Sequence, residues 1–155
     1  MEENLIKNIV FCTDFSPNAD EAFSMAKDLA WRYGATLHIV HVMVTFSFSP
    51  IGEVHVPIEY DAKFVERATD AAASTIQERY VNHLKQKQPY EIEILSGYPA
   101  TEVVEFAREK NIDLIVMGCH GLTGIAHVLF GSTADRVVRK APCSVLTVRL
   151  ARQSK

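Results

Sequence analysis

The sequence predicts a single α/β domain in which a five-stranded parallel sheet is covered by helices on both faces. Short apolar segments typical of buried strands alternate with longer segments of helical period along the chain. The length of 155 residues matches one domain with its own core. The composition, with 48% hydrophobic residues, 7 glycines and 6 prolines, argues against disorder. We therefore expect residues 1–155 to form one domain.

The first strand, helix and second strand follow one another directly. An apolar run predicts a strand over Leu5–Cys12. Ser16 is a suitable N-cap for a helix over Pro17–Tyr33. Proline is favoured at the first helical position, and Gly34 is a typical residue to end the helix. β-Branched and apolar residues predict the second strand over Thr36–Met43.

The middle of the chain contains a long loop and a long helix. The segment Val44–Pro57 contains Pro50, Gly52 and Pro57, and we expect it to be a loop. A helix is predicted over Glu59–Lys87 because Pro89 stops it. Alternating apolar residues then predict the third strand over Tyr90–Leu95.

The last third repeats the alternation of helix and strand. The segment Gly97–Ala100 opens a third helix, and Asp113–Met117 is the fourth strand. A glycine-containing loop is predicted over Gly118–Gly131, followed by a helix over Ser132–Arg139. The fifth strand is predicted over Cys143–Arg149. Because strands and helices alternate throughout, the sheet should be parallel.

The charge balance excludes one class of partner and permits another. The chain has 16 basic and 19 acidic residues, a net charge of −3, whereas a dedicated nucleic-acid binder is strongly basic. We therefore expect no nucleic acid as a partner. The segment Leu114–Lys155 nevertheless carries +5, since Asp135 is its only acidic residue, and such a segment attracts anions.

Targeting segments and metal motifs are not indicated. The residues Met1–Asn4 are acidic, and no run approaches the roughly 18 apolar residues of a membrane span, so we expect a cytoplasmic protein without membrane contact. The cysteines Cys12, Cys119 and Cys143 contain no CxxC pair, and the six histidines show no spacing typical of a metal site. Cys12 and Cys119 follow neighbouring strand ends, where we expect the cytosol to keep them reduced.

Two strand ends carry residues suited to ligand binding. Ligands of doubly wound sheets bind beyond the carboxyl ends of the strands. Thr13 and Asp14 follow the first strand, which places a carboxylate at this edge. Gly131, Ser132 and Thr133 open a helix, where free backbone N–H groups and the helix dipole favour a phosphate. Turn glycines and an ordinary helix cap remain the alternative interpretation.

The glycine-containing loop differs from two common nucleotide-binding motifs. It lacks the lysine of a Walker loop, and the first strand is not followed by a GxGxxG fingerprint. Gly118-x-x-Gly121, nine further residues and then Gly131-Ser132 resemble the ATP-binding branch of the universal stress protein family. The resemblance extends over nearly the whole chain. One departure is Cys12, which stands where the family usually has proline.

The resemblance implies a Rossmann-like fold of the adenine nucleotide alpha-hydrolase-like type, with strand order 3-2-1-4-5, and a set of ligand contacts. Asp14 would bind the ribose hydroxyls beside Thr13, and Gly118 would approach the ribose. Val42 and Met117 would contact adenine, whereas the phosphates would be held by Gly121, Gly131, Ser132 and Thr133. His120 is a further candidate contact, with a solvent-facing turn residue as its alternative.

The resemblance also implies a function. We expect a stress-response or signalling module that binds ATP, with Mg or Mn at the phosphates, and forms a homodimer through its fifth strand. Efficient catalysis is not expected, and ATP hydrolysis would be slow at most, because the loop Gly118–Gly131 has no acid and no lysine. The alternatives are an interaction protein of the same fold that binds no nucleotide, and a small-ligand enzyme that uses Asp14 as a base.

Overall fold

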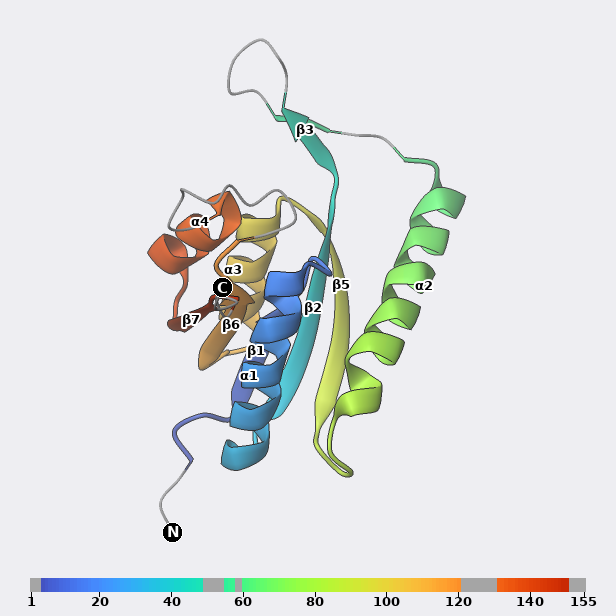
Figure 1. Ribbon diagram of the computed structural model, residues 1–155. Helices are drawn as coiled ribbons and strands as arrows, with labels where there is room; N and C mark the ends of the chain where they lie inside the picture. Colours follow the sequence, from blue (N-terminus) through green and yellow to red (C-terminus); the bar gives the residue numbers. More distant parts are fainter. Residues whose placement is uncertain (1–3, 49–54, 58–59, 121–130, 151–155) are drawn as a thin grey trace, which may run out of the picture.

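The sheet has the predicted order and direction. The computed structural model describes residues 4–48, 55–57, 60–120 and 131–150. Its main sheet has the order β5-β2-β1-β6-β7, with every neighbouring pair parallel (Figure 1). Counted along the chain without the hairpin strands, this order is 3-2-1-4-5, which confirms the prediction. The five strands are β1 (Asn8–Cys12), β2 (Thr36–Val44), β5 (Tyr90–Gly97), β6 (Leu114–Gly118) and β7 (Ser144–Val148).

Helices cover both faces of this sheet, and each face has its own hydrophobic core. Helices α1 (Pro17–Tyr33) and α2 (Ala62–Arg79) share a buried cluster with Ile9 and Phe11 of β1. Helices α3 (Pro99–Glu109) and α4 (Ser132–Lys140) share the other cluster with Val10. Alternate residues of one strand therefore serve opposite faces, as the pleat requires.

Local signals set the bounds of α1 as predicted. The Ser16 hydroxyl accepts a hydrogen bond from the Ala19 backbone N–H at 3.2 Å, and Pro17 occupies the first turn. Gly34 ends the helix with φ of 62°, a left-handed conformation that glycine adopts at little cost. Both ends of this helix are specified by residues that lie next to them in the sequence.

The prediction of a continuous helix to Lys87 is wrong beyond Arg79. The chain leaves the helix at Tyr80, whose side chain is only 1% exposed, and forms a short 3-10 turn, η1 (Val81–His83). Lys87 itself has a positive φ of 66°. The helix also begins later than predicted, at Ala62, where the Asp61 carboxylate caps it by accepting from the Lys63 N–H. Burial of Tyr80 overrides the helical period of the sequence.

The predicted loop Val44–Pro57 is also partly wrong. β2 extends to its first residue, and it contains two short antiparallel strands, β3 (Phe46–Phe48) and β4 (His55–Pro57). β1 begins at Asn8 rather than Leu5, whose side chain is exposed. The bounds of the other strands differ from the predicted ones by one or two residues. The first and last residues of each strand are set by pairing with neighbouring strands, which the sequence of one segment does not reveal.

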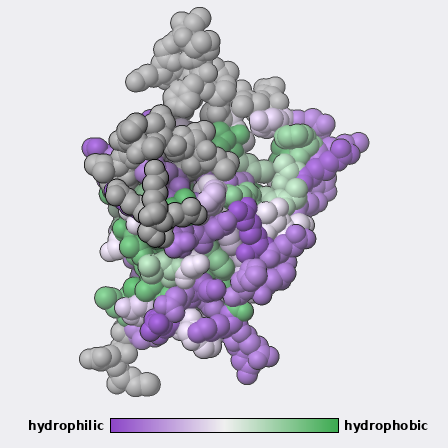
Figure 2. Space-filling model, viewed as in Figure 1, coloured by the Kyte–Doolittle hydropathy of each residue, from purple (hydrophilic) through white to green (hydrophobic). Residues whose placement is uncertain are grey.

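The outer surface is mostly polar. Figure 2 shows hydrophilic residues along the outer edge of α2 and over the lower end of the molecule. Ala72 and Ile76 are the buried residues of α2, and Ile76 packs in the core cluster shared with β1, so this helix presents a narrow apolar stripe inward. Among the described residues, the helices all fall short of the length and apolar character needed to span a bilayer.

Candidate functional site

The sheet brings the two predicted strand ends together. β1 and β6 are direct neighbours, with Phe11 paired to Val116, and the chain order reverses between them. Beyond β1, the Thr13 N–H donates to the Val40 carbonyl at 2.9 Å. Beyond β6, the Cys119 N–H donates to the Val148 carbonyl at 3.0 Å. This reversal is the place at which α/β sheets form ligand crevices.

Thr13 is fixed by hydrogen bonds within the protein. Its side chain is buried, and its hydroxyl oxygen lies 2.7 Å from the hydroxyl oxygen of Tyr80. The same Thr13 oxygen accepts from the Phe15 backbone N–H at 3.0 Å. The hydroxyl therefore holds the turn in place, and the sequence did not reveal Tyr80 as its partner.

Asp14 projects from a tight and strained turn. One oxygen of its carboxylate accepts from the Ser16 N–H at 3.0 Å. This bond orients the Asp14 carboxylate on the turn. Phe15 has a φ of 62°, a conformation that is costly for a residue with a large side chain. Such strain persists only where the surrounding structure enforces it.

His41 supports this turn from β2. Its Nδ1 lies 2.9 Å from the Thr13 carbonyl oxygen, and since a carbonyl only accepts, Nδ1 carries the proton and donates. The ring of His41 packs at 4.6 Å from the ring of Phe15. His41 and Phe15 thus shape the turn of the candidate site, and sequence reasoning missed both contributions. The positive φ of Phe15 has no sequence signal, because glycine and asparagine are the residues expected there.

Arg79 brings a positive charge close to this turn. Its Nη2 lies 2.6 Å from an Asp20 carboxylate oxygen, and this bond is the main reason that the pKa of Arg79 is raised. The charge of Asp14 acts in the same direction at longer range. The edge beyond β1 therefore combines two carboxylates with one guanidinium.

The residues at the end of β6 have clear packing roles. Gly118 lies against α1, because an added Cβ would come within 2.9 Å of the Asn18 Cβ and 3.0 Å of its carbonyl carbon. Met117 is buried in the core on the α3 side, and Val42 packs against the same cluster while remaining partly exposed. Glycine is thus required at position 118 for close approach of strand and helix.

The start of α4 is tied to the end of β6. The Gly131 N–H donates to the Cys119 carbonyl at 2.6 Å, so this amide already has a partner. The first intrahelical bond runs from the Asp135 N–H to the Gly131 carbonyl at 3.0 Å. The N–H groups of residues 132–134 consequently precede the intrahelical ladder, and no side chain of the described residues caps this end. Ser132 is exposed beside them.

The other predicted residues of the glycine loop are only partly described. The Nδ1 atom of His120 lies 3.2 Å from the sulfur of Cys119, and its side chain is half-buried. Gly121 lies outside the described residues. Cys12, Cys119 and Cys143 are free thiols. Burial raises the pKa of the Cys12 thiol to about 12, with a smaller contribution from Cys143.

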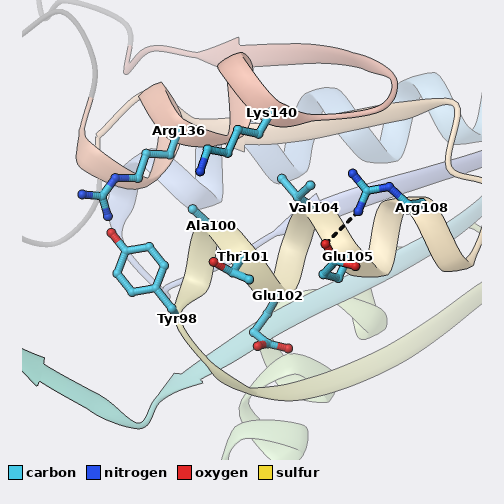
Figure 3. A pocket seen from close by; sticks show the side chains of 9 residues that line it. All are labelled: Tyr98, Ala100, Thr101, Glu102, Val104, Glu105, Arg108, Arg136 and Lys140. Carbon is cyan, nitrogen blue, oxygen red and sulfur yellow. Dashed lines mark hydrogen bonds and ion pairs between the residues drawn. The ribbon is translucent and has the colours of Figure 1, made fainter. Parts of the chain in front are cut away.

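A groove lies between α3 and α4, away from the ends of β1 and β6 (Figure 3). Its volume is about 890 Å³, and none of its lining residues belongs to the predicted nucleotide site. Arg136 lies over the ring of Tyr98 at 5.0 Å, and Arg108 forms an ion pair of 2.7 Å with Glu105. The guanidinium groups of Arg136 and Arg108, which line this groove, therefore contact neighbouring side chains.

The geometry defines a doubly wound α/β domain with a candidate crevice between β1 and β6. The chain belongs to the universal stress protein family, whose model matches residues 5–149. A universal stress protein of Methanocaldococcus jannaschii is 35% identical over 149 residues, which are 95% of this chain and 84% of that protein. The family predicted from the glycine spacing is thereby confirmed.

Solved structures of this family share the fold. Universal stress protein UspA from Lactobacillus plantarum is 26% identical with a TM-score of 0.71, covering 93% of this chain and 98% of that one. A universal stress protein in complex with cAMP is 24% identical with a TM-score of 0.67, covering 93% and 97%. One from Archaeoglobus fulgidus in complex with dAMP is 23% identical with a TM-score of 0.58, covering 92% and 97%.

Proposed function

We propose that this chain is a single-domain stress-response or signalling module that binds ATP in the crevice between β1 and β6. The observation that carries the proposal is the placement of Asp14 and the start of α4 at one edge of the sheet. The Gly131–Cys119 hydrogen bond ties that helix start to β6, which is the neighbour of β1. Asp14 would bind the ribose hydroxyls, and the N–H groups that precede the intrahelical ladder of α4 would bind the phosphates, at one edge of the sheet.

The relatives support an adenine nucleotide as the ligand. The two solved universal stress proteins named above contain cAMP and dAMP, which share adenine and a phosphate with ATP. Val42 and Met117 would contact the adenine, Met117 only through its small exposed part. Asp14 would bind the ribose, with Gly118 beside it and His120 at the rim.

The phosphate contacts require one revision of the sequence-based roles. The Gly131 N–H is used by Cys119, so Gly131 would admit the phosphates through its lack of a side chain. Ser132 and Thr133 would donate their N–H and hydroxyl groups, and Gly121 remains a further proposed contact. Mg or Mn at the phosphates would offset their charge. Thr13 would position Asp14, because its hydroxyl is already bonded to Tyr80.

We further propose a cytoplasmic homodimer that pairs through β7. This strand lies at the edge of the sheet and is paired with β6. An edge strand of apolar residues favours pairing with a second copy about a two-fold axis. Slow ATP hydrolysis at most is expected, so nucleotide occupancy would act by changing contacts with partners rather than by turnover. An interaction protein that binds no nucleotide is the competing function.

Titration with a fluorescent ATP analogue tests the proposed site. The Gly131→Val variant should fold, because Gly131 has a φ of −67° that valine adopts, yet its side chain should block the phosphates. Asp14→Asn keeps an oxygen for the Ser16 bond and should weaken binding by removing the charge. Asp28→Asn, on the exposed face of α1, is the matched control. Unchanged affinity in the first two variants would contradict the site, and no binding by the parent chain would favour the interaction protein.

A further inference from the structure

A second cluster of ligand-type side chains lies near the amino ends of the strands. His38 of β2 is paired with Glu91 of β5, and Val40 is paired with Glu93. Because alternate residues of a strand share a face, the imidazole and both carboxylates project on the α3 side. One ligand atom from each of the three residues lies within 4.8 Å of the others. None of the three belongs to the proposed nucleotide site.

The histidine of this cluster is buried with an unsatisfied nitrogen. His38 is 4% exposed, and among the described residues its Nδ1 has no hydrogen-bond partner. The other ring nitrogen, Nε2, lies 3.3 Å from the Asn8 side-chain oxygen. Since an amide oxygen only accepts, Nε2 carries the proton and donates, which leaves a lone pair on Nδ1 of the neutral ring.

This lone pair lies close to negative charge. Nδ1 of His38 lies 3.3 Å from the Glu91 Oε2, within ion-pair distance but without a hydrogen bond, so two acceptor atoms are close together. A cation between them would remove the conflict. The distance is the one that two adjacent ligand atoms keep around a tetrahedral ion when each bond is about 2.0–2.1 Å long, namely about 3.3 Å.

We propose that His38, Glu91 and Glu93 form a binding site for a divalent transition-metal cation of the Zn²⁺ class. One imidazole and two carboxylates are a donor set that such ions accept, with water in the remaining position. The Glu91 side chain is 53% exposed, which leaves a path for the ion and room for that water. The Nε2–H donation to Asn8 is the outer contact that orients a metal-bound histidine.

Phe106 and Lys110, at the end of α3, border the histidine of this cluster. Lys110 lies over the ring of Phe106, which itself packs edge-on against His38 at 5.8 Å. Phe106 therefore covers the imidazole on the side of α3.

Competition of the full chain with a chromophoric chelator for Zn²⁺, without nucleotide, tests this site. The variants His38→Gln and Glu93→Gln should each lower the affinity by about tenfold or more, as should Asn8→Ala. The exposed His83→Gln is the control and should bind as the parent does. Circular dichroism checks that each variant is folded. If His38→Gln does not fold, Glu93→Gln, which changes a half-buried position, still tests the site.

A spectroscopic readout identifies the nitrogen involved. Nitrogen NMR of the imidazoles should show that one equivalent of Zn²⁺ shifts the Nδ1 resonance of His38 and leaves its Nε2 proton in place. The same shift should persist in Asp14→Asn, since the nucleotide crevice is separate. Equal Zn²⁺ affinity in the parent and in Glu93→Gln, a shift at His120 in place of His38, or no binding by the parent would each overturn the proposal.

Discussion

The hydroxyl group of Tyr80, at the end of α2, lies 2.7 Å from the hydroxyl of Thr13, at the end of β1. Tyr80 donates its proton to an Asp20 carboxylate oxygen at 2.9 Å, so the proton between the two hydroxyls comes from Thr13. The Phe15 N–H in turn donates to Thr13. A continuous chain of hydrogen bonds therefore connects the turn that bears Asp14 to α1 and α2.

Removal of the Tyr80 hydroxyl should destabilise the fold. In Tyr80→Phe the buried Thr13 hydroxyl loses its acceptor, whereas Asp20 keeps its bond to Arg79. An unsatisfied buried donor costs about 1–3 kcal/mol, and we expect the free energy of unfolding in urea to fall by that amount. Tyr33→Phe, at a position that is 37% exposed, is the control and should change it by less than about 0.5 kcal/mol. Equal stability of the two variants would contradict the role given to Tyr80.

Alkaline pH should remove part of the stability through the same residue. Burial is the main cause that raises the pKa of Tyr80 from 10.0 to about 12. The unfolded chain thus loses this proton first, and the contribution of Tyr80 is complete below pH 10 and declines as the pH rises toward about 12. The difference in unfolding free energy between the parent and Tyr80→Phe should shrink over that interval. A constant difference would show that Tyr80 ionises normally.

How far the sequence predicts this fold depends on how local each signal is. Ser16, Pro17 and Gly34 act on adjacent backbone, and the bounds of α1 were predicted correctly from them. The end of α2 was not, because Tyr80 leaves the helix for contacts with Thr13, which lies 67 positions away in the chain. Burial of the Tyr80 side chain against residues distant in the sequence therefore ends the helix earlier than its apolar period predicts.

The same distinction holds for the two sites. Asp14 closely follows β1, and α4 begins at the end of the loop that follows β6, so a parallel sheet with a known order predicts that both lie at one edge. The pairing of His38 with Glu91 depends on the register between β2 and β5, which leaves no trace in the spacing of histidines. Similarly, the role of His41 depends on a contact with the Thr13 carbonyl across two strands.

Cys12 should resist alkylation in the folded protein. Burial is the main cause that raises the pKa of its thiol from 9.0 to about 12, and only the thiolate reacts readily. This shift lowers the thiolate fraction at mildly alkaline pH by about 10³-fold. Peptide mapping after brief treatment with iodoacetamide should find Cys12 unmodified in buffer and modified in urea. Modification at the same rate in both conditions would show that the Cys12 thiol is accessible and ionised.

The proposed dimer makes a directional prediction about β7. Within a strand, the N–H and C=O groups of one residue point to the same side, and successive residues alternate. The Val148 carbonyl accepts from the Cys119 N–H, so Val148 faces β6, and Val145, three positions earlier, faces the outer edge. Proline lacks an N–H and is tolerated only where none is needed.

Val145→Pro should therefore dissociate the dimer and leave the subunit folded, because it removes a donor that faces the second copy. Val148→Pro should instead disrupt the pairing with β6 and lower the free energy of unfolding of the subunit. Light scattering after size-exclusion chromatography should give twice 17.3 kDa for the parent chain and 17.3 kDa for Val145→Pro, with unchanged circular dichroism. A parent chain that runs at 17.3 kDa with and without ATP, or a Val145→Pro variant that stays dimeric, would exclude pairing through this edge.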